Sequence, residues 1–141
     1  MDLTAYLSIA TAIEVMGGLL PGGWPELMAA NHELALAGQA RLSSALGIPP
    51  PAPPEMVGAM AALPIPGAQL DDRAAHALER ALATADHIEI PIPPWPVPAA
   101  RRAPGDPPER VLLRISAQRF NDPGDFEALA AALARRGLAQ G

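Results

Sequence analysis

The segment VLLRISAQRFNDPGD, residues 111–125, decides the expected fold of this chain. Apolar residues alternate along its first seven positions, and this alternation predicts a β-strand with one buried face. One face carries Val111, Leu113, Ile115 and Ala117, and the other carries Leu112, Arg114 and Ser116. Asp122 and Pro123 then predict a helix N-terminus, because Asp caps free backbone N–H groups and proline suits the first helical position. The segment therefore predicts a strand followed directly by a helix.

The helix that begins at Asp122 is expected to brace this strand. Its apolar residues recur at helical spacing and predict one buried stripe. The stripe comprises Phe126, Leu129, Ala130 and Leu133. Gly137 is expected to end the helix after Arg135 and Arg136, because glycine readily adopts the left-handed conformation and Arg complements the negative helix end.

Two further strands are expected upstream. Residues 87–93 alternate strictly, with Ile88, Ile90 and Ile92 on one face and His87, Glu89 and Pro91 on the other. Their prolines predict an edge strand, because proline cannot donate a ladder hydrogen bond. Met56–Ile65 is short, apolar and bounded by prolines, and we interpret it as the other strand.

Three more helices are expected. Leu3–Leu20 reads as a helix with a polar or small stripe, and Trp24–Leu46 as a second helix that Gly47 closes. Asp71–Ala85 is predicted to be a helix with acidic residues at its positive end. Its predicted buried face comprises Ala74, Leu78, Ala81 and Ala85.

This order of elements predicts an α+β fold. Two N-terminal helices precede a small, mostly antiparallel sheet of about three strands, with helices packed on one face. Pro49–Pro54 holds five prolines in six residues and predicts a stiff connector. We therefore divide the chain into N-terminal helices at residues 1–47, a proline-rich connector at 48–55 and a small α+β domain at 56–141.

The composition excludes several functions. The chain has 141 residues, a net charge of −5, no cysteine and no lysine, so its ten basic residues are all arginines. This charge balance disfavours nucleic-acid binding. The missing cysteines exclude disulfides and thiolate catalysis, and the missing lysines leave no side-chain amine for a Schiff base. The apolar N-terminus lacks a basic leader and is interrupted by Thr4, Ser8, Thr11 and Glu14, so we expect a cytoplasmic protein without a membrane span.

Arg114 is the main candidate site residue, because a guanidinium between apolar strand neighbours requires a partner. Two interpretations remain open. Arg114 forms a salt bridge with Glu89 across the sheet or with nearby Asp122. Alternatively, its planar donor fork binds the carboxylate of a ligand.

The remaining polar residues point to no further site. His32, His76 and His87 are too scattered to predict a metal site. Glu89 and His87 share a strand face, which is weak support for acid–base chemistry. Trp95, in a proline-rich loop, is expected to be a hydrophobic anchor.

RISAQRFN at residues 114–121, followed by an acidic helix start and LAAAL, resembles the C-terminal segment of class V aminotransferases. These are fold type I enzymes that use pyridoxal 5′-phosphate (PLP). Isopenicillin N epimerase-like proteins look most similar, and cysteine desulfurases are relatives. Other segments resemble family elements in the same order. Residues 4–24 resemble the exit from the cofactor domain, 31–35 the interdomain helix, and 56–64 and 87–91 the first two strands of the small domain.

The resemblance implies that Arg114 binds the carboxylate of an amino-acid substrate, with PLP as the cofactor of the complete enzyme. The family's Schiff-base lysine and other cofactor ligands lie upstream in a large domain. The chain therefore looks like the C-terminal third of such an enzyme, with no catalytic or cofactor-binding residue of its own, and is expected to be inactive alone. We expect a homodimer or association with a large domain. The alternative is a stand-alone, non-catalytic binding or dimerisation domain that kept the fold.

Overall fold

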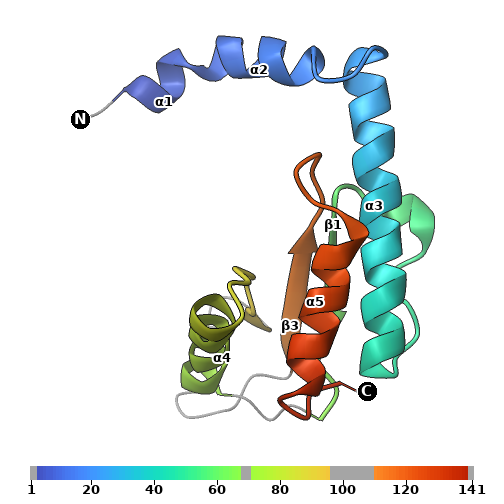
Figure 1. The fold of residues 1–141 in the computed structure, drawn as a ribbon, viewed down its shortest axis with the longest axis vertical. Helices are drawn as coiled ribbons and strands as arrows, with labels where there is room; N and C mark the ends of the chain where they lie inside the picture. Colours follow the sequence, from blue (N-terminus) through green and yellow to red (C-terminus); the bar gives the residue numbers. More distant parts are fainter. Residues whose placement is uncertain (1–2, 68–70, 96–109, 140–141) are drawn as a thin grey trace.

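The computed structural model describes residues 3–67, 71–95 and 110–139 and confirms the expected α+β fold (Figure 1). The helices are α1 (Thr4–Leu7), α2 (Ile9–Gly17), α3 (Gly23–Leu46), the short 3-10 helix η1 (Pro54–Met56), α4 (Asp72–Ala85) and α5 (Pro123–Ala134). The strands are β1 (Met60–Pro64), β2 (Pro94–Trp95) and β3 (Arg110–Ser116).

The three strands form an antiparallel sheet in the order β1-β3-β2. Met60 pairs with Ser116 and Pro64 with Leu112 on one side of β3, and Pro94 pairs with Val111 on the other. The alternation predicted for β3 is confirmed. Its inner face is buried, and its outer face is half-buried or exposed. The buried set is Val111, Leu113, Ile115 and the following Ala117.

The inner face of the sheet is covered by α3 and α5. In Figure 1, α5 runs beside α3 and across β3, while α4 lies on the opposite side of β3 from α3. The predicted stripe of α5 is buried in one core with α3 and the sheet. Gly38 allows the close approach, because an added Cβ would lie 2.8 Å from Cζ of Phe126 and 2.9 Å from Cδ1 of Ile115.

Local signals fix three helix ends as the sequence predicts, whereas α5 ends at Ala134, before the predicted Arg135, Arg136 and Gly137. Asp122 and Asp125 form a capping box at the start of α5, with Asp122 Oδ1 accepting the Gly124 N–H at 2.6 Å. Asp71 Oδ1 accepts the Ala74 N–H at 2.7 Å and caps α4. Gly47 ends α3 with a φ of 66°, in the left-handed region that glycine adopts without steric cost.

Residues 87–93 differ from the predicted strand. The assigned strand β2 starts only at Pro94. Two bonds nevertheless align the segment with β3, because Pro91 O accepts the Arg114 N–H at 3.1 Å and Pro93 O accepts the Leu112 N–H at 3.0 Å. Prolines supply acceptors but no donors, which leaves the ladder incomplete. The predicted faces hold, since Ile92 is buried whereas Glu89 and Pro91 are exposed.

Three other predictions need correction. Leu3–Leu20 is not one helix, because Ser8 separates α1 from α2 and its hydroxyl donates to Ala5 O at 3.1 Å, a local bond that competes with the helix. The Met56–Ile65 strand is shorter than expected, since β1 starts only at Met60, opposite the end of β3. The buried face of α4 is rotated from the prediction and consists of Ala75 and Leu82, with Leu78 packed beside them.

The N-terminal helices α1 and α2 form an arm that runs sideways from the top of α3, above the sheet and separate from it (Figure 1). Neither helix contains a buried residue. The large apolar side chains exposed on the arm are Leu3, Tyr6, Leu7, Ile9, Ile13, Val15 and Leu19. Within the described residues, no helix is both long and apolar enough to cross a membrane.

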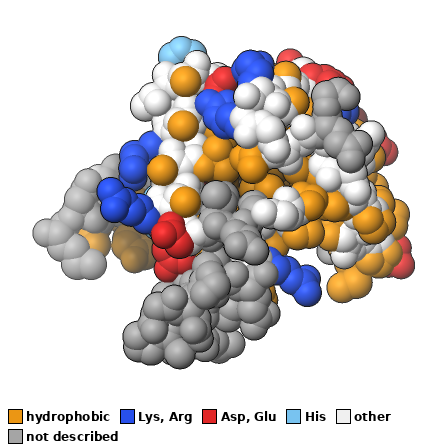
Figure 2. Space-filling model, turned by 90° about the horizontal axis from the view of Figure 1, so that it is seen from below, with side chains coloured by type: hydrophobic (Ala, Val, Ile, Leu, Met, Phe, Trp, Pro, Cys, Tyr) orange, Lys and Arg blue, Asp and Glu red, His pale blue; other side chains and the backbone are white. Residues whose placement is uncertain are grey.

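The opposite end of the molecule is also partly apolar. Figure 2 shows this face from below, with hydrophobic side chains filling much of its middle and charged groups lying mostly around them. The proline-rich connector contributes exposed Pro50, Pro51 and Pro53 to the molecular surface. The connector is held against α3, where Gln39 Nε2 donates to Ala52 O at 3.5 Å.

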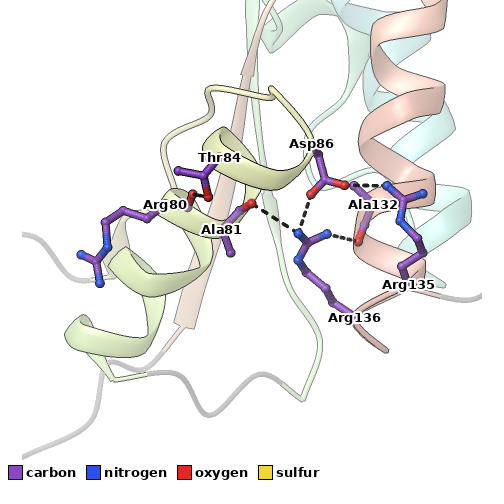
Figure 3. A network of polar contacts seen from close by, with 7 residues as sticks. All are labelled: Arg80, Ala81, Thr84, Asp86, Ala132, Arg135 and Arg136. Carbon is purple, nitrogen blue, oxygen red and sulfur yellow. Dashed lines mark hydrogen bonds and ion pairs between the residues drawn. The ribbon is translucent and has the colours of Figure 1, made fainter.

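An ion-pair network joins α4 to α5 (Figure 3). Asp86, just after α4, accepts from Arg135 Nη2 at 2.6 Å and also from Arg136. Arg136 Nη1 donates to Ala132 O at 2.8 Å. The two guanidinium donors, Arg135 first and Arg136 second, hold the pKa of the Asp86 carboxyl below its ordinary value. The network fixes α4 to the C-terminal end of α5.

Candidate functional site

Arg114 lies in the middle of β3 on the outer face of the sheet, opposite Ala62 of β1. Its backbone N–H donates to Pro91 O. Its side chain is exposed and makes no hydrogen bond or ion pair with any described residue. The structure therefore does not show the salt bridge to Glu89 or Asp122 that the sequence left open. A guanidinium with five unused donors remains available to an external anion.

A cavity of about 340 Å³ lies beside Arg114. Its size falls at the lower end of the range for small-molecule sites. Four segments line the cavity: residues 87–91, the second half of β3, the loop at 118–121 and the first turns of α5. The apolar part of the wall comprises Ile88, Ile90, Pro91, Ile115, Phe120, Phe126 and Leu129.

The loop after β3 shapes one wall of this cavity. Gln118 Oε1 accepts from Asn31 Nδ2 of α3 at 3.0 Å, and the Asn31 side chain is buried. Asn121 Oδ1 accepts the Gln118 N–H at 3.1 Å, and Asn121 Nδ2 donates to Asp125 Oδ2 at 3.0 Å. These bonds hold the loop so that Phe120, 85% exposed, stands at the cavity.

The opposite wall is held by Glu79 of α4. Its Oε1 accepts the Ile92 N–H at 2.6 Å, and its Oε2 lies 3.0 Å from His76 Nδ1. Burial raises the pKa of the Glu79 carboxyl, but the bonds from Ile92 and His76 outweigh burial and leave that pKa lowered. The ionised Glu79 carboxylate therefore accepts the backbone N–H of Ile92, which has no hydrogen-bond partner in β3.

The cavity brings together three polar side chains that the sequence analysis had singled out. Glu89, His87 and Arg114 all line it. His87 has a φ of 57°, in the left-handed region that is unusual for a residue with a Cβ. Neither His87 nor Glu89 makes a side-chain hydrogen bond with another described residue. Unused polar groups and a strained backbone at one cavity are typical of a binding site.

The other histidines and Trp95 lie away from this cavity. His32 Nδ1 is 2.8 Å from Val57 O and links α3 to the start of the sheet domain. Trp95 is 49% exposed on β2, and the loop after it lies outside the described residues. No three potential metal-ligating side chains cluster anywhere in the described parts of the chain.

The sequence identified Arg114 but missed part of the site around it. Asn31 and Gln118 are 87 positions apart, and no sequence pattern pairs them. Phe120 carried a weak signal, as a large apolar residue between polar neighbours directly before a helix cap.

Comparisons with known proteins add no relative. Neither a scan against protein-family models nor a search of the curated proteins finds a match for this chain.

Proposed function

We propose that this chain acts as the small, C-terminal domain of a PLP-dependent enzyme similar to class V aminotransferases and isopenicillin N epimerases. In this proposal Arg114 binds the carboxylate of an amino-acid substrate. The observation that supports it is the free guanidinium of Arg114, held on a central strand at the rim of a cavity of ligand size. A planar Arg fork matches a carboxylate with two parallel hydrogen bonds.

The residues of this chain do not fit the cofactor itself. PLP enzymes hold their cofactor through a lysine amine, and the sequence contains no lysine. The proposed contribution of the chain is therefore limited to substrate binding. A companion domain would have to hold PLP, and we expect no turnover from this chain alone.

Ligand binding by Arg114 can be measured directly by NMR titration of the ¹⁵N-labelled chain with L-norleucine. We expect saturable shifts around residues 114–121 in the wild-type chain. Arg114→Gln should weaken binding by about ten-fold or more, because a hydrogen bond to a charged group contributes about 1.5–3 kcal/mol. L-norleucinamide lacks the carboxylate. Its affinity for the wild-type chain should therefore be no higher than the affinity of L-norleucine for Arg114→Gln.

Arg110→Gln provides the matched control. Arg110 is exposed on the same strand but pairs with Trp95 at the far end of β3 and does not line the cavity. Its substitution should leave the affinity for L-norleucine unchanged. Equal affinities in the wild-type chain and in Arg114→Gln would overturn the proposed role of Arg114.

A second candidate function is a stand-alone assembly domain, and the exposed arm favours it. Seven large apolar side chains on and beside α1 and α2 lie at least 46% exposed. Such a surface is typical of an interaction site. Sedimentation velocity distinguishes the candidates: a stable homodimer of the isolated chain supports assembly, whereas a monomer with intact α1 and α2 favours a missing companion domain.

A further inference from the structure

The cavity beside Arg114 contains a second unused charge, the carboxylate of Glu89. Three polar residues of the wall, Gln118, Asn121 and Asp125, are engaged in bonds that shape the loop and the start of α5. His87, like Glu89, makes no side-chain hydrogen bond with a described residue. Glu89 is exposed to the cavity and makes no hydrogen bond or ion pair with any described residue. One cavity thus offers a free cation and a free anion.

The backbone register places these two charges apart on one face of the sheet. Arg114 donates its N–H to Pro91, and Leu112 donates to Pro93, so residues 91 and 114 lie opposite each other. Glu89 precedes Pro91 by two residues and therefore shares the outer face with Arg114. Diagonal neighbours of this kind are roughly 7–8 Å apart, within reach of long side chains. No ion pair joins Glu89 to Arg114 among the described residues, so both charges are available to a ligand in the cavity that they line.

The rest of the cavity lining is largely apolar. Ile90, Phe120 and Phe126 line the same cavity. A ligand that satisfies all these groups has a carboxylate at one end, a cation at the other and a short hydrocarbon chain between them.

We propose that Glu89 makes this site selective for amino acids with a cationic side chain, such as L-lysine and L-ornithine. This inference rests on the proposed binding of the α-carboxylate by Arg114. The α-amino nitrogen is the group on which the proposed chemistry acts, and a carboxylate paired with it would keep it protonated. Glu89 therefore binds the side-chain ammonium and acts as a specificity-determining residue.

The test compares ligands that differ at one end only, again by NMR titration of the full chain. L-lysine has both charges, L-norleucine lacks the side-chain ammonium, and cadaverine lacks the carboxylate. The wild-type chain should bind L-lysine about ten-fold or more tightly than L-norleucine, the effect expected for one charge-assisted hydrogen bond. Cadaverine should bind more weakly than L-lysine.

Glu89→Gln should abolish the preference for L-lysine while leaving the affinity for L-norleucine unchanged. Glu33→Gln is the matched control, since Glu33 is exposed on α3 outside the cavity and contributes the same net charge. It should keep the wild-type preference, which separates a local contact from general attraction to an acidic protein. Arg114→Gln should weaken L-lysine and L-norleucine together.

Three outcomes would overturn the inference, and they also test the proposed function separately. In the first outcome, the wild-type chain binds L-lysine and L-norleucine equally, and Arg114→Gln weakens both. This result would rule out the role of Glu89 and support that of Arg114. Equal weakening of both ligands by Glu89→Gln would show that Glu89 binds the α-ammonium. Failure of both ligands to bind would overturn the inference and the proposed function together.

Discussion

The two most apolar helices of the molecule, α2 and α5, have opposite surroundings. The twelve residues of α5 include five buried ones, whereas the nine residues of α2 include none. Hydrophobic composition therefore does not explain which helix is buried, because the exposed α2 is the more apolar of the two. Local signals do distinguish them. A capping box and a first-position proline start α5, whereas no side chain caps α2. A short, uncapped helix gains stability chiefly from packing, and α2 buries none of its residues within the described fold.

The largest expected difference between the arm and the rest of the described fold, here called the body, appears when one leucine in each is replaced by alanine. Leu113 of β3 is fully buried, and Leu7 of the arm is 81% exposed. Leu113→Ala should lower the free energy of unfolding by about 2–5 kcal/mol, because it removes buried methyl groups and leaves a cavity. Leu7→Ala should change it by less than about 0.5 kcal/mol. Urea denaturation of both variants measures the difference.

A large loss of stability from Leu7→Ala would contradict this comparison, because it would mean that the arm is buried in an assembly. In that case the effect should depend on protein concentration. A loss of stability that is the same at all protein concentrations would instead show that the arm packs against the rest of its own chain.

A smaller effect is expected at the contact between α3 and α5. Gly38→Ala would add a Cβ within 2.9 Å of Phe126 and Ile115. Overpacking of this kind costs about 1–3 kcal/mol, which exceeds the roughly 1 kcal/mol that alanine gains over glycine in helix propensity. Gly58→Ala is the control, because nothing lies within 4 Å of its added Cβ. We expect thermal unfolding to show a lower Tm for Gly38→Ala only. A gain of stability at Gly38 would show that α5 can move away from α3.

These differences also explain how much of the fold could be predicted. β3 and the capped ends of α4 and α5 are specified by contiguous residues, and the structure reproduces them. The split at Ser8, where the hydroxyl donates to Ala5 O, was missed. α4 has a pronounced apolar stripe, but the prediction centred it on Ala74, Ala81 and Ala85 instead of on Ala75 and Leu82. Residues 87–93 kept their predicted faces, but their prolines prevented a full ladder.

The sequence singled out Arg114, Glu89 and His87 individually, but it did not predict the cavity that they line. Arg114 stands out because it interrupts an apolar strand, which any reading of the alternation detects. The cavity depends on contacts between distant segments, such as Asn31 with Gln118 and Glu79 with Ile92. These pairs have no local pattern, since their geometry exists only after the sheet and the helices have packed.

The smallest expected effect concerns the acid sensitivity of the body, where the Asp86 network joins α4 to α5. The pKa of Asp86 is lowered in the folded chain from its usual value of 3.8 by bonds from Arg135 and Arg136. A lowered carboxyl pKa contributes stability that is fully present above 3.8 and is lost as the pH falls through the folded value. The arm offers no such network, because Glu14 makes no ion pair with any described residue.

Asp86→Asn isolates this contribution from other carboxyl groups. At pH 6 the variant should be less stable than the wild-type chain, by less than either core substitution, because the exposed Arg135 partner is screened by solvent. The difference in unfolding free energy should shrink between pH 4 and pH 3, since protonation removes the same charge from the wild-type chain. Glu79 also has a lowered pKa, but it is present in both chains and does not affect the difference. A difference that stays constant from pH 6 to pH 3 would show that Asp86 stabilises α4 through neutral hydrogen bonds rather than through its charge.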